Sequence, residues 1–270
     1  MADMTKSYIT FNAKIEGATE TANKVGPVNN WGHSCFEQVS IKVNGVTLTE
    51  ATNLYPYEAM VSTIVSYGTD AKKSHLTLAG YAKDEGGKMN HFDPSEQGCN
   101  SGLKTRSLLV DEGQMTEMLI RPFNALFQQD RLLPGGTSID ITLIPSKSKF
   151  NLMANADDDS DKYTTVISGL ELHVRQVKVM PSVMASIVTE REKRNILLPM
   201  RRLNTVPISM SSGTQTLTRP ISSGVIPRRI WCVMVDETAR YGGYKLNPFN
   251  FQHFNMNELY LKVNSVHVPQ

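Results

Sequence analysis

The sequence predicts an all-β fold in which one sandwich-like domain is followed by the start of a second, similar domain. Three observations predict it. Short segments alternate between apolar and polar residues, which is the period of a half-buried strand. Polar loops rich in Gly, Asn, Ser and Asp separate these segments, as is typical of sandwiches. Finally, residues 30–48 recur at 250–268 with a constant offset of 220 and no gap.

The repeated stretch is expected to be a β-hairpin. Residues 39–43 alternate, and Asn44-Gly45 then supplies the two residues that tolerate a tight type I′ turn. In the second copy residues 259–263 alternate, and Asn264-Ser265 makes a weaker turn because Ser lacks the freedom of Gly. Asn and His also match upstream of the strands. This favours two copies of one β-domain over a chance likeness between two hairpins.

Strand alternation also assigns the faces of the hairpins. Ile41 and Leu261 are expected to point into the cores of their domains, with Lys42 and Lys262 outward, because a one-residue slip would invert every side chain. The two copies are 220 residues apart in a chain of 270 residues, so only about 50 residues remain for the second copy of the domain. We therefore expect a fragment or truncated gene product whose second domain stops after its early strands. Its open strand edges would favour aggregation over orderly assembly.

The first 180 residues are expected to form the first domain. Alternating or strand-like patterns predict strands at 8–15, 39–48 (the hairpin), 114–122, 138–143 and 170–179. The last of these slips by one residue after Val174, as a β-bulge would make it. Helical spacing with Gly68 as terminator predicts a helix at 58–67. Residues 81–107 are rich in Gly, Asn and Asp and are expected to form a long loop.

A connecting segment is expected at 181–195, with a short helix over 181–194, and the second domain begins at 196. Residues 230–235 form a continuous apolar run that predicts a buried strand. The domains are therefore expected at 1–180 and 196–270, joined by 181–195.

Composition sets few limits on function. The formal net charge is +2 and the pI about 8.3, which is too mild to indicate specific nucleic-acid binding. The chain opens without the apolar stretch of a signal peptide, and no apolar run approaches the roughly 20 residues of a membrane span. Cys35, Cys99 and Cys232 are odd in number and widely spaced, which favours reduced thiols in an intracellular setting.

Motifs for catalysis or ligand binding are incomplete. Asp157, Asp159 and Asp161 imitate a calcium loop, but Lys162 stands where that loop needs Gly. Gly86-Gly87-Lys88 imitates a phosphate loop but is followed by Met rather than Ser or Thr. The interpretation of both is a solvated loop.

The six histidines are scattered, and no nucleophile elbow is present. His33 and His253 are expected to be structural because they occupy equivalent positions in the repeat. The pairs Arg201-Arg202 and Arg228-Arg229 are interpreted as solvated or interfacial. The sequence therefore predicts no catalytic, cofactor-binding or metal-binding residues, and no cofactor.

Several motifs nevertheless resemble a known family, and they run in order over most of the chain. They are VGPVNN at 25–30, NLYPYEA at 53–59, SYG at 66–68, AKKSHL at 71–76, NSGLKTR at 100–106, LFQQDRLL at 126–133, VRQVKV at 174–179 with PS at 181–182, VD at 235–236, and NPFNF at 247–251. The chain resembles the double jelly-roll major capsid proteins of Polinton (Maverick) elements and adintoviruses.

The resemblance implies a hexon-like double jelly roll. This sequence departs from the family at both ends: the usual N-terminal strands of the first roll are shortened or absent, and most of the second roll is missing after Gln270. Trimers of such chains would form pseudo-hexagonal capsomers of an icosahedral shell. The partners implied are the chain itself, in homotrimers and between capsomers, and a penton-type minor capsid protein. The place implied is the virion, assembled in the cytoplasm or nucleus of the host cell. No membrane span and no specific nucleic-acid binding are expected.

Two other classes stay open. A non-viral jelly-roll binding module, such as a lectin, or a domesticated capsid relative would need an aromatic and polar pocket. Trp31, Trp231 and Tyr241 are the aromatic residues available for it. A β-barrel enzyme has no supporting constellation, so we expect the chain not to be an enzyme.

Overall fold

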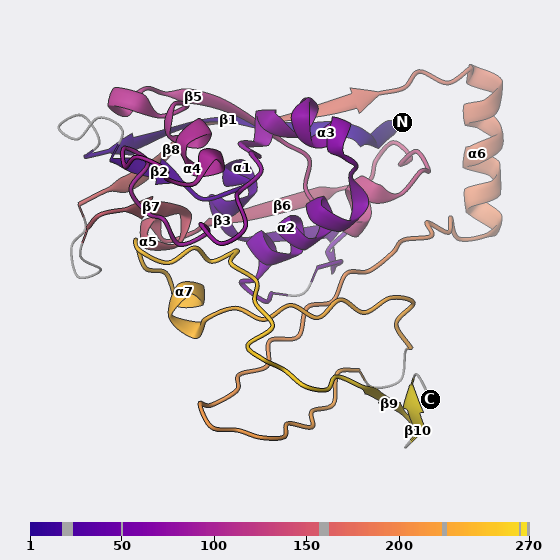
Figure 1. The fold of residues 1–270 in the computed structure, drawn as a ribbon. Coiled ribbons are helices and arrows are strands. Elements are labelled where there is room, and N and C mark those ends of the chain that lie inside the picture. The colour runs from indigo at the N-terminus through magenta and orange to yellow at the C-terminus, as the bar shows by residue number, and fades with distance from the viewer. Residues whose placement is uncertain (18–23, 50, 157–161, 223–225, 265, 269–270) are drawn as a thin grey trace.

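The chain is strand-rich and folds around several small antiparallel sheets (Figure 1). This computed structural model describes residues 1–270 apart from 18–23, 50, 157–161, 223–225, 265 and 269–270. One sheet has the order β5 (Thr116–Ile120), β1 (Ala2–Glu16) and β8 (Thr164–Gln176). Another has the order β4 (Val46–Thr47), β3 (Phe36–Val43) and β6 (Ile139–Pro145). A short pair joins β2 (Val25–Pro27) to β7 (Leu152–Ala154).

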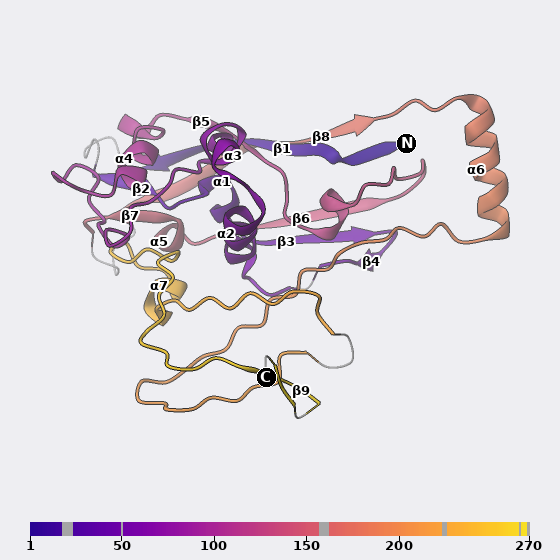
Figure 2. The ribbon, with the colours of Figure 1, turned by 45° about the vertical axis from the view of Figure 1, so that its right-hand side comes forward.

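The strand β1 is central because alternate side chains along it are apolar and buried. Ile9, Phe11, Ala13 and Ile15 are each at most 2% exposed, as expected for a strand with one face on a core. The Phe11 ring meets the Phe36 ring of β3 edge-on, with 5.2 Å between their centroids. Side chains of the two three-stranded sheets therefore contribute to one core cluster, and the turned view shows the two sheets one above the other (Figure 2).

The ladder between β1 and β8 contains a large bulge. Residues 4–7 of β1 lie opposite a single residue of β8, Val174. Within the bulge the Ser7 hydroxyl donates to the Asp3 carbonyl (2.7 Å) and accepts from the Arg175 N–H (3.1 Å). This buried hydroxyl thus replaces ladder bonds that the bulge removes. The sequence predicts an irregularity in the other strand, after residue 174. The structure instead places this bulge in β1, and a second register shift puts one extra residue in β8 between Ser168 and Glu171.

Short helices occupy the connections between the strands. They are α1 (Trp31–Ser34), α2 (Tyr55–Ser66), α3 (Thr69–Lys73), α4 (Ser101–Ser107) and α5 (Ser148–Asn151), with the 3-10 turns η1 (His75–Ala79), η2 (Asp111–Gly113) and η3 (Ala125–Gln128). The helix predicted at 58–67 is confirmed as α2, which begins earlier because the fixed φ of Pro56 suits a first turn. The loop predicted over 81–107 is wrong at its end, where α4 forms. There the Asn100 side chain caps the helix by accepting from the Gly102 N–H at 3.1 Å.

Beyond β8 the chain has little regular structure. The helix predicted at 181–194 is confirmed as α6 (Pro181–Lys193), which stands apart from the sheets without a buried residue (Figures 1 and 2). The strand predicted at 230–235 is wrong, because these residues form no strand and are exposed or half-buried. An apolar run becomes a buried strand only when other strands pair with its backbone, and no described strand pairs with this one. The short helix α7 (Glu237–Tyr241) follows.

Both copies of the sequence repeat form hairpins with the same register. In the first, Val43 pairs with Val46 across the β3–β4 turn. In the second, β9 (Leu261–Val263) pairs with β10 (Val266–Val268), and Val263 faces Val266, 220 residues later. The turn residues Asn44 and Asn264 have φ of 49° and 48°; Ser265 lies outside the described residues.

The environments of the two hairpins differ. Ile41 is fully buried and Lys42 is exposed, which confirms the predicted face of the first hairpin. Leu261 is only half-buried, while Lys262 is exposed. Upstream of the strands, residues 31–34 are helical as α1 whereas 251–254 are not. The division into domains at 1–180, 181–195 and 196–270 stays a prediction.

Candidate functional site

The motifs that carry the family resemblance meet in two buried networks. Residues 25–30 and 100–106 converge on Arg106, and residues 53–59 and 247–251 converge on Tyr57. The first is a network of hydrogen bonds around a buried ion pair, and the second is a cluster of aromatic rings.

Arg106 extends from α4 into the interior and is fully buried. Its Nε donates to the Pro27 carbonyl, its Nη1 to the Ala82 carbonyl and its Nη2 to Asp84 Oδ1, each at 2.9 Å. The carboxylate of Asp84 has two further donors, the side-chain amides of Asn29 (3.0 Å) and Asn100 (2.8 Å). The network joins β2, the loop before α4 and α4 itself.

At the centre of this network Arg106 and Asp84 form a buried ion pair, and both groups have further hydrogen-bond partners. Burial lowers the pKa of Arg106, and the neighbouring carboxylate of Asp84 opposes that shift. A charge buried in this way is tolerated because hydrogen bonds replace its water. Gly102 packs so closely on Asp84 that an added Cβ would lie 2.6 Å from Oδ1. The pair therefore has a structural role, which is to hold the 81–100 loop against the sheets.

The second network docks the C-terminal segment on the first domain. Tyr57 in α2 meets Phe249 edge-on (5.7 Å between centroids) and also contacts Phe150 (5.9 Å) and Phe251 (6.3 Å). Phe249 is only 2% exposed. Aromatic pairs in this arrangement add to the stabilisation given by burial.

Hydrogen bonds fix the same segment in place. The Tyr244 hydroxyl donates to the Tyr163 carbonyl at 3.1 Å, and the Tyr244 carbonyl accepts from the Ala154 N–H at 3.0 Å. The Asn247 N–H donates to Asn90 Oδ1 at 3.1 Å. Residues around α7, although they follow the expected boundary, thus complete the core of the preceding residues.

The two histidines of the repeat lie in different surroundings. His33 is buried, and its Nδ1 lies 2.7 Å from the Tyr55 hydroxyl. Burial holds the pKa of His33 at about 3, so the ring is neutral near pH 7. This agrees with the predicted structural role of His33. In contrast, His253 is exposed, and its Nδ1 accepts from the Asn255 N–H at 3.1 Å.

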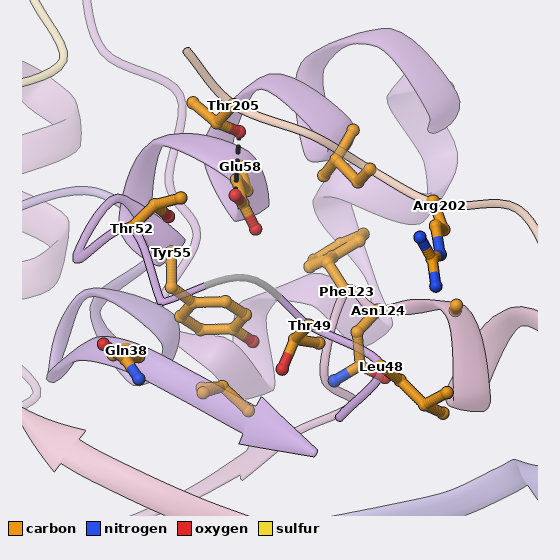
Figure 3. Close-up of a pocket in the computed structure, with 13 residues that line it drawn as sticks. Gln38, Leu48, Thr49, Thr52, Tyr55, Glu58, Phe123, Asn124, Arg202 and Thr205 are labelled. Atoms are coloured by element: carbon orange, nitrogen blue, oxygen red, sulfur yellow. Dashed lines mark hydrogen bonds between the residues drawn. The ribbon is translucent and has the colours of Figure 1, made fainter. Parts of the chain in front are cut away.

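A small, partly open cavity lies where residues 202–205 pass α2 and β3 (Figure 3). The Thr205 hydroxyl donates to Glu58 Oε1 at 2.7 Å and holds the segment there. The free volume is about 20 Å³, close to the room one water molecule needs and far below the roughly 300–1,000 Å³ of ligand pockets. Asn124 lines the cavity with its amide buried and without a hydrogen-bond partner among the described residues. The cavity suits a water molecule rather than an organic ligand.

The aromatic residues expected to line a binding pocket do not come together. Trp31 is fully buried in the core, whereas Trp231 and Tyr241 are 55% and 63% exposed. None of the three lines the cavity beside Thr205. The structure thus does not bring these three aromatic residues together into one pocket.

The incomplete ligand motifs gain no support. Asp157, Asp159 and Asp161 lie outside the described residues. Lys88 pairs with Glu85 at 2.8 Å and therefore does not extend freely from its Gly-Gly turn. Elsewhere in the described chain, no three His, Cys, Asp or Glu side chains gather as metal ligands would.

All three cysteines are free thiols. Cys35 and Cys99 are buried, and Cys232 is exposed. Burial raises the pKa of the Cys35 thiol, which makes it less reactive.

The exposed apolar residues are unevenly distributed along the chain. Of the 30 large apolar side chains that are exposed among the described residues, 24 lie at or beyond Leu170. Three of them, Leu170, Leu172 and Val174, alternate along β8 with exposures of 51%, 43% and 39%. Leu172 pairs with the buried Ile9, so this face of β8 continues the core face of β1. These exposures show that the described chain covers this part of the face only partly.

Comparisons with known proteins give one distant relative. No family model matches the chain. The chain is 22% identical over 241 residues to the uncharacterized protein F54H12.2 of Caenorhabditis elegans. The aligned region covers 87% of this chain and 54% of that protein. The chain thus spans about half the length of this relative. Within the described residues, no helix has the length and apolar character needed to cross a membrane.

Proposed function

We propose that the chain is a structural subunit of an icosahedral shell, a major capsid protein of the Polinton and adintovirus type. In this proposal residues 1–180 form the first jelly roll and 196–270 begin the second. Trimers of the chain form pseudo-hexagonal capsomers, joined at the vertices by a penton-type protein. The shell assembles inside the host cell, and the chain has no catalytic role.

The observation that carries the proposal is the nesting of the strand pairs. β1 pairs with β8, β2 with β7 and β3 with β6, all antiparallel. A jelly roll has this pattern, because one long antiparallel ribbon wraps around so that the first strand meets the last. The innermost pair departs from the pattern. β4 pairs with β3 and β5 pairs with β1, so β4 and β5 are not partners.

Two further observations support the proposal. The matching β3–β4 and β9–β10 hairpins are what two copies of one roll would supply. The uncovered apolar residues beyond Leu170 are typical of a surface that another chain or domain covers. The function proposed therefore depends on surfaces rather than on a pocket.

Light scattering after size-exclusion chromatography tests the need for partners. We expect the chain to elute above its monomer mass as a broad distribution of larger species, because its open strand edges favour aggregation over a discrete trimer. A variant with Leu170, Leu172 and Val174 changed to Asp is expected to associate less. The matched control changes Thr142, Glu171 and Lys42, which are exposed and polar, to Ala. A chain that stays monomeric at high micromolar concentration would contradict the proposal.

A further inference from the structure

The positive charge of this chain is concentrated in one segment. Residues 193–235 contain seven Lys or Arg and no Asp or Glu. The other 227 residues carry a formal charge of −5, given the 28 basic and 26 acidic residues of the whole chain. The net charge of the whole chain is thus +2, although the formal charge of residues 193–235 alone is +7. A charge asymmetry of this kind is typical of chains that bind anionic polymers.

The structure leaves most of this charge available. Arg201, Arg202, Arg219, Arg228 and Arg229 are all exposed. Among the described residues no carboxylate forms a salt bridge with any of these five guanidinium groups. The two remaining cations of the segment, at 193 and 194, pair with a glutamate of α6.

The backbone around these arginines has an open form. The described residues between α6 and α7 contain no helix and no strand, and the segment loops away from the sheets (Figures 1 and 2). It returns to the body of the protein near Thr205, which bonds to Glu58. Beside the second arginine pair, Trp231 is 55% exposed. Leu198 and Met200 also pack against a buried cluster of the folded part. The segment thus presents guanidinium groups and one aromatic ring on an irregular stretch that contacts the folded part at several points.

We propose that Arg201, Arg202, Arg219, Arg228 and Arg229 bind the phosphodiester backbone of nucleic acid without sequence preference. Six of the seven cations are Arg, whose planar group donates two hydrogen bonds to one phosphate. Trp231 supplies a face on which a base can stack. This binding goes beyond the proposed shell function and does not depend on it, since it requires only the charge and exposure of the segment.

An anionic membrane surface is the competing partner. Basic segments that bind membranes are typically compact clusters of four to eight cations next to a membrane anchor. Here the arginines are spread as two pairs and a single residue over about thirty positions. A polymer with regularly repeated charges matches this spacing better than a compact patch of lipid headgroups does.

Fluorescence anisotropy with a labelled 30-nucleotide single strand of mixed sequence tests the proposal. The test variant carries R201Q, R202Q, R228Q and R229Q. The control carries K42Q, K73Q, K104Q and K147Q, which remove the same charge from exposed positions on the folded part. Urea midpoints of both variants are measured first, and both are expected to match the original chain because all eight side chains are exposed.

We expect the original chain to bind and to lose affinity steeply with salt. In the arginine variant, affinity is expected to fall at least about tenfold, and the slope of log K against log salt by about 3, since each lost phosphate contact removes about 0.7. The lysine control is expected to change affinity less than about twofold. The proposal is overturned if the original chain does not bind the strand, or if the control weakens binding as much as the arginine variant. It is also overturned if phosphatidylserine vesicles, but not the oligonucleotide, are bound through these arginines.

Discussion

Replacing Arg106 by Met tests the buried ion pair on which the 81–100 loop depends. Met has a similar length and leaves the apolar contacts of the side-chain stem largely in place. The change removes three hydrogen bonds of 2.9 Å, and it leaves the Asp84 carboxylate, 4% exposed, without its cation. Breaking a buried pair by removing one partner costs about 3–5 kcal/mol, because the remaining charge stays buried.

Urea unfolding followed by tryptophan fluorescence measures this cost, because Trp31 is fully buried in the folded chain. With an m value of about 2–3 kcal/mol/M, the midpoint is expected to fall by about 1–2 M. A second variant, R106M with D84N, removes the orphaned charge and is expected to be more stable than R106M alone. A loss below about 1 kcal/mol for R106M, or no recovery in the double variant, would refute the reasoning.

Three further predictions concern the core, the histidine and the docked C-terminal segment. I41A is expected to lower the free energy of unfolding by about 2–5 kcal/mol and K42A by less than about 0.5, in urea melts; equal losses would show that the face is wrongly assigned. Because burial holds the pKa of His33 at about 3, the unfolded chain binds a proton between pH 3 and 6.5 that the folded chain does not. Stability is thus complete above about pH 6.5 and falls as the pH drops, by up to about 1.4 kcal/mol per unit. The H33Q variant has no imidazole at this position and is expected to lose less stability as the pH falls. The same pH dependence of the unfolding free energy in H33Q and in the unmodified chain would contradict the lowered pKa of His33. F249A is expected to release the segment around α7 and to speed its cleavage in limited proteolysis, whereas F254A, at a residue 52% exposed, is not; equal cleavage would show that the segment is not docked through Phe249.

Local patterns predict the elements that depend on nearby residues. The alternation at 39–43 and the Asn44-Gly45 turn give the first hairpin correctly. Helical spacing likewise gives α2 and α6. In each case the period, the turn or the Pro lies within the element itself, so the sequence contains the whole signal.

Elements that depend on distant partners are predicted less well. The run at 230–235 has the composition of a buried strand, but no described strand pairs with it. The three-residue strands β2 and β7 are too short to show a period and exist because they pair with each other. α4 begins inside a polar stretch, where its signal is the single cap residue Asn100.

The buried networks could not be derived from spacing. Arg106 lies 22 residues from Asp84 in the sequence, and Asn29 lies 55 residues from it. Neither separation suggests contact, and an isolated Arg is usually exposed. The motifs at 25–30 and 100–106 contain Asn29, Asn100 and Arg106, but neither motif indicates that these side chains meet. The concentration of charge in 193–235 is visible in the sequence, but its exposure is not.

The central claim is that the chain is a shell subunit, and its presence in particles tests this most directly. Extracts of cells that express the gene are treated with nuclease and separated on a density gradient. The fast-sedimenting fractions are then examined by mass spectrometry and by electron microscopy with an antibody against the chain. The account predicts that peptides of this chain dominate those fractions and that the antibody labels icosahedral shells. A chain found only in the slowly sedimenting fractions, with unlabelled particles or none, would contradict it.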